Sequence, residues 1–320
     1  MYVIGAGQLE QSRLFEINAS NITAMSNGSS VVALDIRNNG GNAENMTILA
    51  QAHPLIKISP PSVSLLIEPG KIARQKFKLS FLQTNDRIRN PLTFQATTGK
   101  GMTFRVKMSD TFACCVRAPA DFSLDGTWQN WTRTQILHAD QRTQVEQPMG
   151  VAWKGPDDVS ARIMTMWDKN YFYLGLQVHD DVFFAKQLSN RMFLNDAVEI
   201  GFDLEHRLSG NSRLWQFVMG KSESGNTLFC HQPGTGFLVP APPSKMFIQP
   251  TGNGGDVDYQ VAIPWSQLGS FMPEAGRQIG FGVIVDDSDG KPNDRKFISW
   301  FGSGISSKRP QELGDLIFVE

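Results

Sequence analysis

Hydrophobic and polar positions alternate almost perfectly in the stretch NDAVEIGFDLEH, residues 195–206. The apolar side chains on one side of the extended chain are Val198, Ile200, Phe202 and Leu204. The opposite side carries Glu199, Gly201 and Asp203. A period of two with β-branched and aromatic members predicts a half-buried strand. The polar side is open to several interpretations: a solvent-facing surface, a metal site, a pair of catalytic carboxylates or the floor of a binding groove.

The same two-residue period recurs along the whole chain. Residues 62–82 read as strand, Pro-Gly turn and strand, and residues 160–181 read as a hairpin that turns at 168–170. Helical periodicity is weak, and only residues 264–271 contain a pattern for a short helical turn. Strands without intervening helices predict an all-β chain of two antiparallel sandwiches. We expect an Ig-like sandwich over residues 1–118 and a second sandwich over residues 119–320.

Charge supports a boundary near residues 117–122. Up to residue 118 there are 13 Lys/Arg and 7 Asp/Glu, a net charge of +6, and after it 17 and 24, a net charge of −7. Neither value suggests a nucleic-acid-binding protein, and no run of Lys and Arg is interleaved with aromatic residues. No apolar stretch reaches the roughly 18 residues that a membrane-spanning helix needs. We therefore expect neither nucleic acid nor membrane as a partner.

Sequence patterns for catalysis are weak. Glu199 and Asp203 lie four residues apart on one predicted strand, which separates them by about 13 Å at roughly 3.3 Å per residue. That distance exceeds the carboxylate separations of retaining and inverting glycosidases, although carboxylates on other strands could lie closer. The sequence contains no HExxH, P-loop or GxSxG motif. Its three cysteines have neither zinc spacing nor a disulfide pattern. We expect no enzyme activity from these residues.

Seven phrases follow one another in the second region. They are LDGTWQNW (124–131), SARIMTMWDKNYFYLGLQVHDD (160–181), NDAVEIGFD (195–203), YQVAIPWSQL (259–268), GFGVIVDDSDG (280–290), ISW (298–300) and LGDLIF (313–318). In this order they resemble the family 9 carbohydrate-binding modules and the related DOMON-like sandwiches with a jelly-roll type of fold. The resemblance covers about two hundred residues. In the first region, SPPSVSLLIEPG resembles, loosely, the Ig-like accessory modules of bacterial extracellular glycosidases.

The resemblance implies a sugar site on the second sandwich. Family members clamp a sugar between two aromatic side chains, and a carboxylate, an amide and a basic residue hold its hydroxyls. Aromatic planes suit the apolar faces of sugar rings, and charge-assisted hydrogen bonds orient hydroxyls. The resemblance places the carboxylate at Glu199, the first aromatic at Phe193 and the basic residue at Gln216, with Arg213 nearby. Gly201 would then give the ligand room to approach the backbone.

The second clamp aromatic is a departure from the family pattern. The resemblance places it just before RPQELG, where Ser307 stands, so the clamp lacks its second plane unless Phe301 supplies it. Five of the seven tryptophans are predicted to pack in the interior. They are Trp128, Trp131, Trp167, Trp265 and Trp300.

Loop aspartates suggest a metal site. The stretch VDDSDG (285–290) fails as an EF-hand, because its register puts Val285 at the first ligand position and Lys296 at the twelfth. The resemblance implies structural calcium held by loop carboxylates, and we expect its ligands among Asp286, Asp287 and Asp289. Further aspartates that could contribute are Asp157, Asp158, Asp180 and Asp181. The alternative is turn chemistry, since aspartates often hydrogen-bond their own backbone in turns.

We expect a non-catalytic module that binds a polysaccharide or oligosaccharide. It would keep a linked glycoside hydrolase or other carbohydrate-active domain, outside this chain, near its substrate by raising effective concentration. Such a protein is expected to be extracellular or periplasmic. One alternative is a structural or interaction module whose groove no longer binds sugar. Another is a DOMON-like electron-transfer domain with haem held by Met192 and His179, although CxxCH is absent and haem is not expected.

Overall fold

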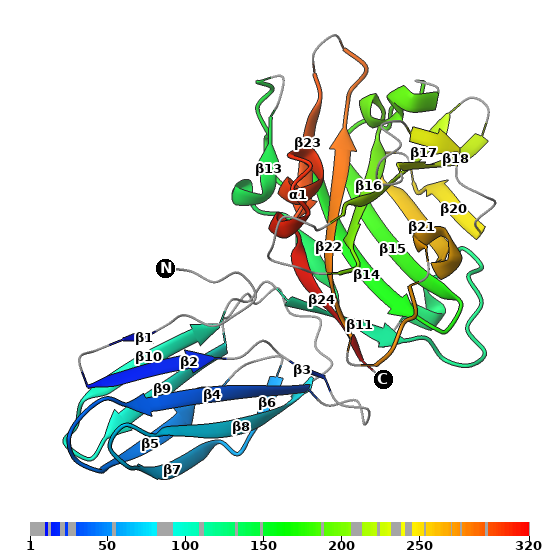
Figure 1. The fold of residues 1–320 in the computed structure, drawn as a ribbon. Helices are drawn as coiled ribbons and strands as arrows, with labels where there is room; N and C mark the ends of the chain where they lie inside the picture. Colours follow the sequence, from blue (N-terminus) through cyan, green and yellow to red (C-terminus); the bar gives the residue numbers. More distant parts are fainter. Residues whose placement is uncertain are drawn as a thin grey trace. The chain divides into compact units, whose positions relative to one another are not determined.

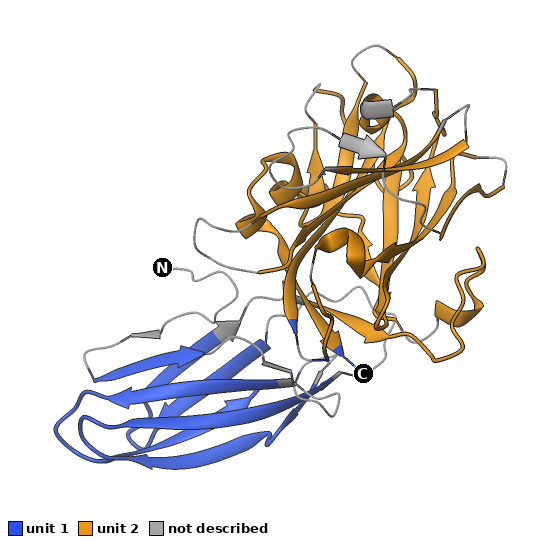
Figure 2. Cartoon of the chain, turned by 45° about the vertical axis from the view of Figure 1, so that its right-hand side comes forward, with its two compact units in different colours: residues 1–112, 275–277, 319–320 blue, residues 113–274, 278–318 orange. Residues whose placement is uncertain are grey.

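The computed structural model forms two compact units, drawn in Figure 2. One consists of residues 1–112 with 275–277 and 319–320, and the other of residues 113–274 with 278–318. The residues that the structure describes are 10–11, 14–19, 23–24, 30–52, 56–81, 92–108, 112–131, 134–147, 150–186, 189–205, 213–222, 225–231, 238–240, 245–252, 254–269, 271–275, 277–291 and 294–319.

The first unit is built from two antiparallel sheets (Figure 1). Their strands are β1 (Glu10–Gln11), β2 (Phe15–Ala19), β3 (Thr23–Ala24), β4 (Ser30–Asn38), β5 (Glu44–Ala50), β6 (Ile56–Ser59), β7 (Ser62–Ile67), β8 (Ile72–Phe81), β9 (Leu92–Thr98) and β10 (Thr103–Met108). One sheet has the order β1-β2-β4-β8-β6, with β3 on β4, and the other β10-β9-β5-β7. The rings of Phe77 and Phe94, one from each sheet, lie 4.8 Å apart, so the sheets pack face to face. The Ig-like type of this sandwich stays a prediction.

The second unit contains one long sheet. Its strands are β11 (Phe112–Arg117), β12 (Leu137–Ala139), β13 (Val145–Glu146), β14 (Val159–Trp167), β15 (Tyr171–Asp180), β16 (Ala197–Asp203), β17 (Trp215–Ser222), β18 (Gly225–His231), β19 (Leu238–Pro240), β20 (Lys245–Pro250), β21 (Val257–Pro264), β22 (Gln278–Asp287), β23 (Lys296–Trp300) and β24 (Gly314–Val319). The main path is β19-β18-β17-β16-β22-β24-β11-β14-β15-β21-β20. β12 pairs with β14, and β23 pairs with both β22 and β13.

Helical segments in the second unit are short. They are η1 (Gln129–Trp131), η2 (Arg142–Gln144), η3 (Ser189–Leu194), η4 (Trp265–Leu268), α1 (Ser303–Ser306) and η5 (Pro310–Glu312). The expected helical turn within residues 264–271 is η4. The chain is therefore all-β, as its two-residue period predicts. Among the described residues, no helix has the length and apolar character to cross a bilayer.

The long sheet folds over on itself around an aromatic core. Phe172 on β15 lies 5.0 Å from Phe202 on β16 and 5.5 Å from Phe281 on β22, measured between ring centroids. These strands are distant along the sheet path, so the two halves of the sheet face each other and make a sandwich. Trp167, Trp265 and Trp300 are buried in this interior, as the sequence predicts.

The hairpin expected at residues 160–181 is confirmed. β14 pairs antiparallel with β15, and Trp167 stands opposite Phe172. Asp168 closes the turn, because its Oδ1 accepts the backbone N–H groups of Asn170 and Tyr171, each at 2.7 Å. Trp128 and Trp131 pack over this hairpin at Gly175, where an added Cβ would lie 2.8 Å from the Trp128 ring. The aspartate in the turn and the glycine in the strand thus fix where the two tryptophans can sit.

β11 joins the second unit, although the predicted boundary at residue 118 left it in the first. It pairs in parallel with β14, with Val116 opposite Met166. The second sandwich is therefore not purely antiparallel. The alternating pattern of residues 112–117 identifies a strand but carries no information on its partner, which explains the difference.

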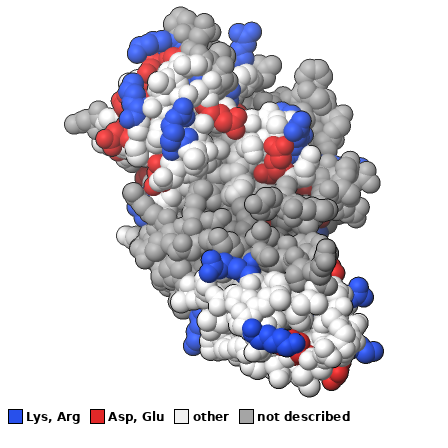
Figure 3. Space-filling view, turned by 90° about the vertical axis from the view of Figure 1, so that its left-hand side faces the viewer, with Lys and Arg blue, Asp and Glu red and all other residues white. Residues whose placement is uncertain are grey.

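Charged side chains are mixed on the surface. On the face drawn in Figure 3, Lys and Arg of the described residues are scattered among Asp and Glu and among uncharged residues. This part of the surface does not gather one sign into an extended patch.

Core packing yields a matched test. Met166 on β14 is fully buried, whereas Met272 is 67% exposed. Because a buried methionine loses both transfer free energy and packing when truncated, we expect Met166→Ala to lower the free energy of unfolding by about 2–5 kcal/mol. Met272→Ala is the control and should change it little. Urea denaturation measures both, and equal losses would contradict this description of the core.

Candidate functional site

The polar face of β16 is covered, although its pattern predicts a half-buried strand. β16 lies between β17 and β22, and all seven of its residues are buried. At Gly201 an added Cβ would lie 2.5 Å from Cγ1 of Ile305, which belongs to α1. The expectation that Gly201 makes room for a ligand is therefore wrong: the missing side chain makes room for Ile305.

Glu199 and Gln216, both predicted ligand contacts, meet on this face. Gln216 stands opposite Gly201 in the β16–β17 register, which puts its side chain on the same face as Glu199. Its Nε2 donates to Oε2 of Glu199 at 2.5 Å. Its Oε1 accepts a hydrogen bond from Nζ of Lys308 at 2.6 Å. Gln216 thus links the buried carboxylate to an exposed lysine.

Arg295 completes this group, which we call the Glu199 network: Phe193, Glu199, Gln216, Asp286, Arg295 and Lys308. Nη2 of Arg295 contacts Oε1 of Glu199 at 3.2 Å and Oδ1 of Asp286 at 2.5 Å. The guanidinium carbon lies 5.2 Å from the Phe193 ring centroid, within cation–π range. The predicted aromatic platform therefore already packs against the cation that holds the predicted carboxylate.

Burial and neighbouring charges shift pKa values in the network. Burial raises the pKa of Asp286 well above its usual range, and the charge on Glu199 raises it further, whereas Arg295 opposes the shift. Desolvation lowers the pKa of Lys308, and the positive charge of Arg295 acts in the same direction. Two carboxyl groups and two basic side chains are thus crowded into a small region.

The remaining predicted site residues lie outside the network. Arg213 is exposed just before β17 and takes no part in the described hydrogen bonds of the network. Phe301 packs against Trp300, with ring centroids 4.8 Å apart, and its ring also fills the space above Gly314. Ser307 is exposed and donates to the carbonyl of Ser303 at 2.5 Å. The structure therefore brings together Phe193, Glu199 and Gln216 but places Phe301 at the edge of the core.

Two non-glycine residues of the described chain have positive φ: Phe301, at 50°, and Lys308, at 57°. They stand on either side of α1, which covers the polar face of β16. Such backbone conformations are costly and concentrate at functional positions. The one at Lys308 belongs to the residue that reaches Gln216, which the sequence pattern did not single out.

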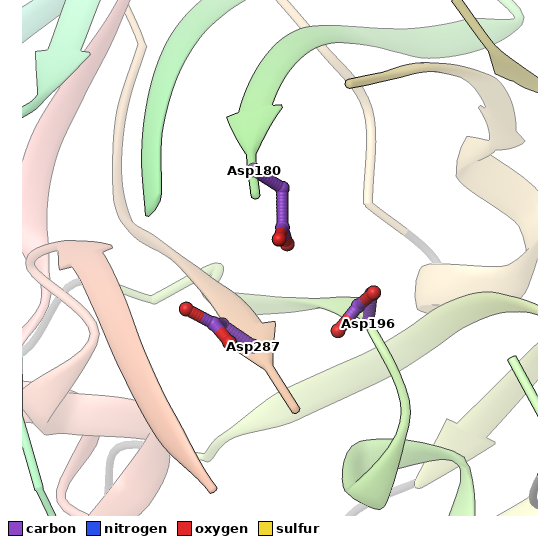
Figure 4. Close-up of side chains that lie close together, drawn as sticks. All are labelled: Asp180, Asp196 and Asp287. Carbon is purple, nitrogen blue, oxygen red and sulfur yellow. The ribbon is translucent and has the colours of Figure 1, made fainter. Parts of the chain in front are cut away.

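Beside the network lies a second group of carboxylates, the acidic cluster of Asp180, Asp196 and Asp287 (Figure 4). They come from the end of β15, the residue before β16 and the end of β22. One oxygen of each lies within 4.8 Å of the others. All three residues are buried, and among the described residues Oδ2 of Asp180 and Oδ1 of Asp287 have no hydrogen-bond partner.

The acidic cluster contains more carboxyl groups than its one buried lysine contacts. Lys296 is 1% exposed, and its Nζ lies 2.8 Å from Oδ2 of Asp287 and 3.3 Å from Oδ1 of Asp158. Burial, together with the charge on Asp287, raises the pKa of Asp180 to about 8. Burial raises the pKa of Asp287 to about 7, although Lys296 opposes the shift. Carboxylates that lie this close repel one another unless a cation or protons lie between them.

The donor set fits a hard divalent cation. Calcium takes oxygen ligands at about 2.3–2.6 Å, so two ligands of one ion can lie up to roughly 5 Å apart, which agrees with the spacing here. Of the three predicted calcium ligands, the structure places Asp287 in the cluster. Asp286 points to Arg295 instead, and Asp289 lies 3.8 Å from Nζ of Lys291. Asp196 was missed, because nothing in its local pattern separates it from an ordinary strand-flanking residue.

The residues considered for haem have other contacts. Met192 is buried in a cluster with Ala197, Val218 and Phe229. His179 pairs through Nδ1 with Oδ1 of Asp256 at 2.5 Å. Both side chains are thus used by the protein itself.

Removal of Arg295 tests the network. Arg295→Met leaves two buried carboxylates without their cation, so we expect a loss of about 3–5 kcal/mol in the free energy of unfolding. Arg309→Met is the matched control, because Arg309 is exposed and its pair with Glu312 lies at the surface, where loss should stay below about 1 kcal/mol. Urea denaturation at neutral pH measures both. A small loss for Arg295→Met would mean that the network does not hold the two carboxylates.

Comparisons with solved structures found modules of one family. A solved family 9 carbohydrate-binding module from Caldicellulosiruptor kristjanssonii, in complex with cellotriose, is 16% identical, with a TM-score of 0.45, and the match covers 65% of this chain and 93% of that one. A module of the same family from that organism, in complex with glucose, is 16% identical, with a TM-score of 0.43 and coverage of 64% and 95%. The search of curated proteins found no match.

A family model also matches this chain. The model of the family described as "Carbohydrate family 9 binding domain-like" matches residues 121–320, which is more than half of the chain. These residues include both the Glu199 network and the acidic cluster. The chain therefore belongs to the carbohydrate family 9 binding domain-like family.

Proposed function

We propose that the second unit binds a carbohydrate reversibly at the Glu199 network. Its membership in a family of non-catalytic carbohydrate-binding modules supports this function. The observation that carries the proposal is the meeting of Glu199, Gln216 and Lys308 next to the ring of Phe193. Hydroxyl groups need such charged and amide partners, and the apolar face of a sugar ring needs an aromatic plane.

Lys308 is the residue that first meets the sugar in this proposal. An ammonium group has three donors, and the described contacts of Lys308 use one of them, to Gln216. Lys308 lies at the surface, and in this proposal its other donors reach ligand hydroxyls. Arg295 acts behind it by holding Glu199 and Phe193 in position before the ligand arrives. Such preorganisation lowers the entropic cost of binding.

A single aromatic plane limits the affinity. Ser307 stands where the resemblance expects the second clamp ring, and Phe301 packs at the core edge. We expect this module to bind more weakly than one that holds the sugar between two rings. Recognition then depends more on hydrogen bonds from the network than on stacking.

The wider role follows from this binding. We infer that the module keeps a polysaccharide near a linked catalytic domain by raising its effective concentration, in an extracellular or periplasmic protein. The linked domain and the location are predictions from the sequence. The principal alternative is an interaction module that no longer binds sugar, and haem binding is the further alternative.

We also propose that the acidic cluster holds a calcium ion. Asp180, Asp196 and Asp287 would supply carboxylate ligands, and the ion would supply positive charge that joins three separate segments of the chain. The unpartnered, buried oxygens of Asp180 and Asp287 support this assignment. Without the ion, the same oxygens repel one another inside the protein.

Sugar binding can be tested by removing the charge of Glu199. Glu199→Gln should weaken binding about 10- to 100-fold, because hydrogen bonds to a charged group contribute about 1.5–3 kcal/mol. Lys308→Met should weaken it as well, while Glu205→Gln, at an exposed position just after β16, is the control and should bind normally. Isothermal titration with glucose, cellotriose, xylotriose and mannotriose, in the presence of calcium chloride, gives the affinities. A folded wild-type protein that binds none of these sugars, and is not retarded in polysaccharide gels, would contradict the proposal.

Calcium binding can be tested on stability. Calcium at about 100 times its dissociation constant should stabilise the chelator-treated protein by about 2.7 kcal/mol, or raise its Tm by roughly 5–10 °C. Asp180→Asn should lose this response yet melt no lower than wild type in chelator, because burial and the charge on Asp287 already disfavour the charged form of Asp180, and the amide is neutral. The control is the neighbouring Asp181→Asn, which lies at the surface beside Lys154 and should respond like wild type. A wild-type Tm that calcium leaves unchanged would refute the site.

A further inference from the structure

We propose that cation occupancy of the acidic cluster controls the affinity of the Glu199 network for sugar. This inference rests on the proposed function and adds regulation of the same site. Its basis is geometric: the network and the cluster share three segments of backbone.

The first shared segment is the end of β22. Asp286 and Asp287 are consecutive, and on a strand consecutive side chains point to opposite faces. Asp286 contacts Arg295 of the network at 2.5 Å, whereas Asp287 contributes to the cluster. A cation that fixes the carboxylate of Asp287 therefore also fixes the backbone from which Asp286 holds Arg295.

The second shared segment is residues 295–296, where β23 begins, and it repeats the arrangement. Arg295 belongs to the network, and the next residue, Lys296, is buried against Asp287 at 2.8 Å. Lys296 also stands opposite Asp287 in the β22–β23 register. The two segments thus separate the two sites. Asp286 and Arg295 pair on the side of the network, and Asp287 and Lys296 pair on the side of the cluster.

The third shared segment leads from η3 into β16. It carries Phe193 of the network and, three residues later, Asp196 of the cluster. The carboxylate of Asp196 accepts the backbone N–H groups of Phe184 and of Ser288, the latter at 2.9 Å. Asp196 therefore ties this segment to the chain after β15 and to the chain after β22, next to the cluster.

A cation in the acidic cluster would affect the positions of the residues in the Glu199 network. Without a cation, no common ligand joins the three carboxyl groups that meet from the ends of β15 and β22 and from the residue before β16. A divalent cation bound by all three would draw these segments together. Phe193, Asp286 and Arg295 then occupy the positions in which they support Glu199, and the sugar meets a site that needs less ordering.

Coupling of this kind is reciprocal. If calcium raises the affinity for sugar by some factor, sugar must raise the affinity for calcium by the same factor. Factors of about 5 to 150 are typical for two sites coupled through shared structure. We expect a factor in that range here.

Isothermal titration provides the test on the whole chain. The probe is whichever of glucose, cellotriose, xylotriose and mannotriose binds wild type most tightly. It is titrated into wild type, Asp180→Asn and Asp181→Asn. Each protein is measured once with chelator and once with saturating calcium chloride. We expect wild type and the control Asp181→Asn to bind the probe about 5- to 150-fold more tightly with calcium. Asp180→Asn should bind it equally in both conditions. Calcium titrations with and without the probe should give the same factor.

The outcomes separate the two proposals. Equal sugar affinity with and without calcium, in a wild-type protein whose Tm calcium raises, overturns the coupling and leaves sugar binding intact. A wild-type protein that binds the probe but not calcium has the same consequence. Failure to bind any of the four sugars in either condition removes the proposed function, and the coupling with it.

Discussion

Burial of charge at the centre of a sheet is the constraint on which the second unit depends. Glu199 and Asp286 lie on neighbouring strands with almost no exposure, and a buried carboxylate without a partner is very costly. Arg295 meets that cost by contacting both carboxylates, and Phe193 packs against the guanidinium. The ring of Phe193 and the contact from Lys308 to Gln216 lie around this buried group.

The sequence predicts a good part of this site. Alternation alone identifies β16 and the face that carries Glu199, and the resemblance pairs Glu199 with Gln216 and Phe193. Arg295 and Lys308 are absent from that prediction because their partners in the network are far away in the sequence. Arg295 lies 96 residues from Glu199, and Lys308 lies 92 residues from Gln216. Contacts over such separations come from the path of the sheet, which no periodicity encodes.

The predicted calcium ligands show a second reason why sequence alone does not define a site. Asp286 and Asp287 look alike in the sequence, and a one-residue shift in strand register would exchange their roles. Packing decides that Asp287 joins Asp180 and Asp196, whereas Asp286 faces Arg295. Gly201 is similar, because the absence of a side chain indicates close approach but not whether a ligand or Ile305 fills the space. In each case the residue type can be read from the sequence, but its neighbour depends on the fold.

The parallel pairing of β11 has a practical consequence for anyone who wishes to produce the second unit alone. The family match begins at residue 121, downstream of this strand, yet β11 occupies an interior place in the sheet between β24 and β14. A fragment that begins at residue 121 would leave the edges of β24 and β14 without their partner strand. Unpaired strand edges can pair with other chains and promote aggregation. An expression fragment should therefore begin at or before residue 112, so that the sheet keeps its continuity.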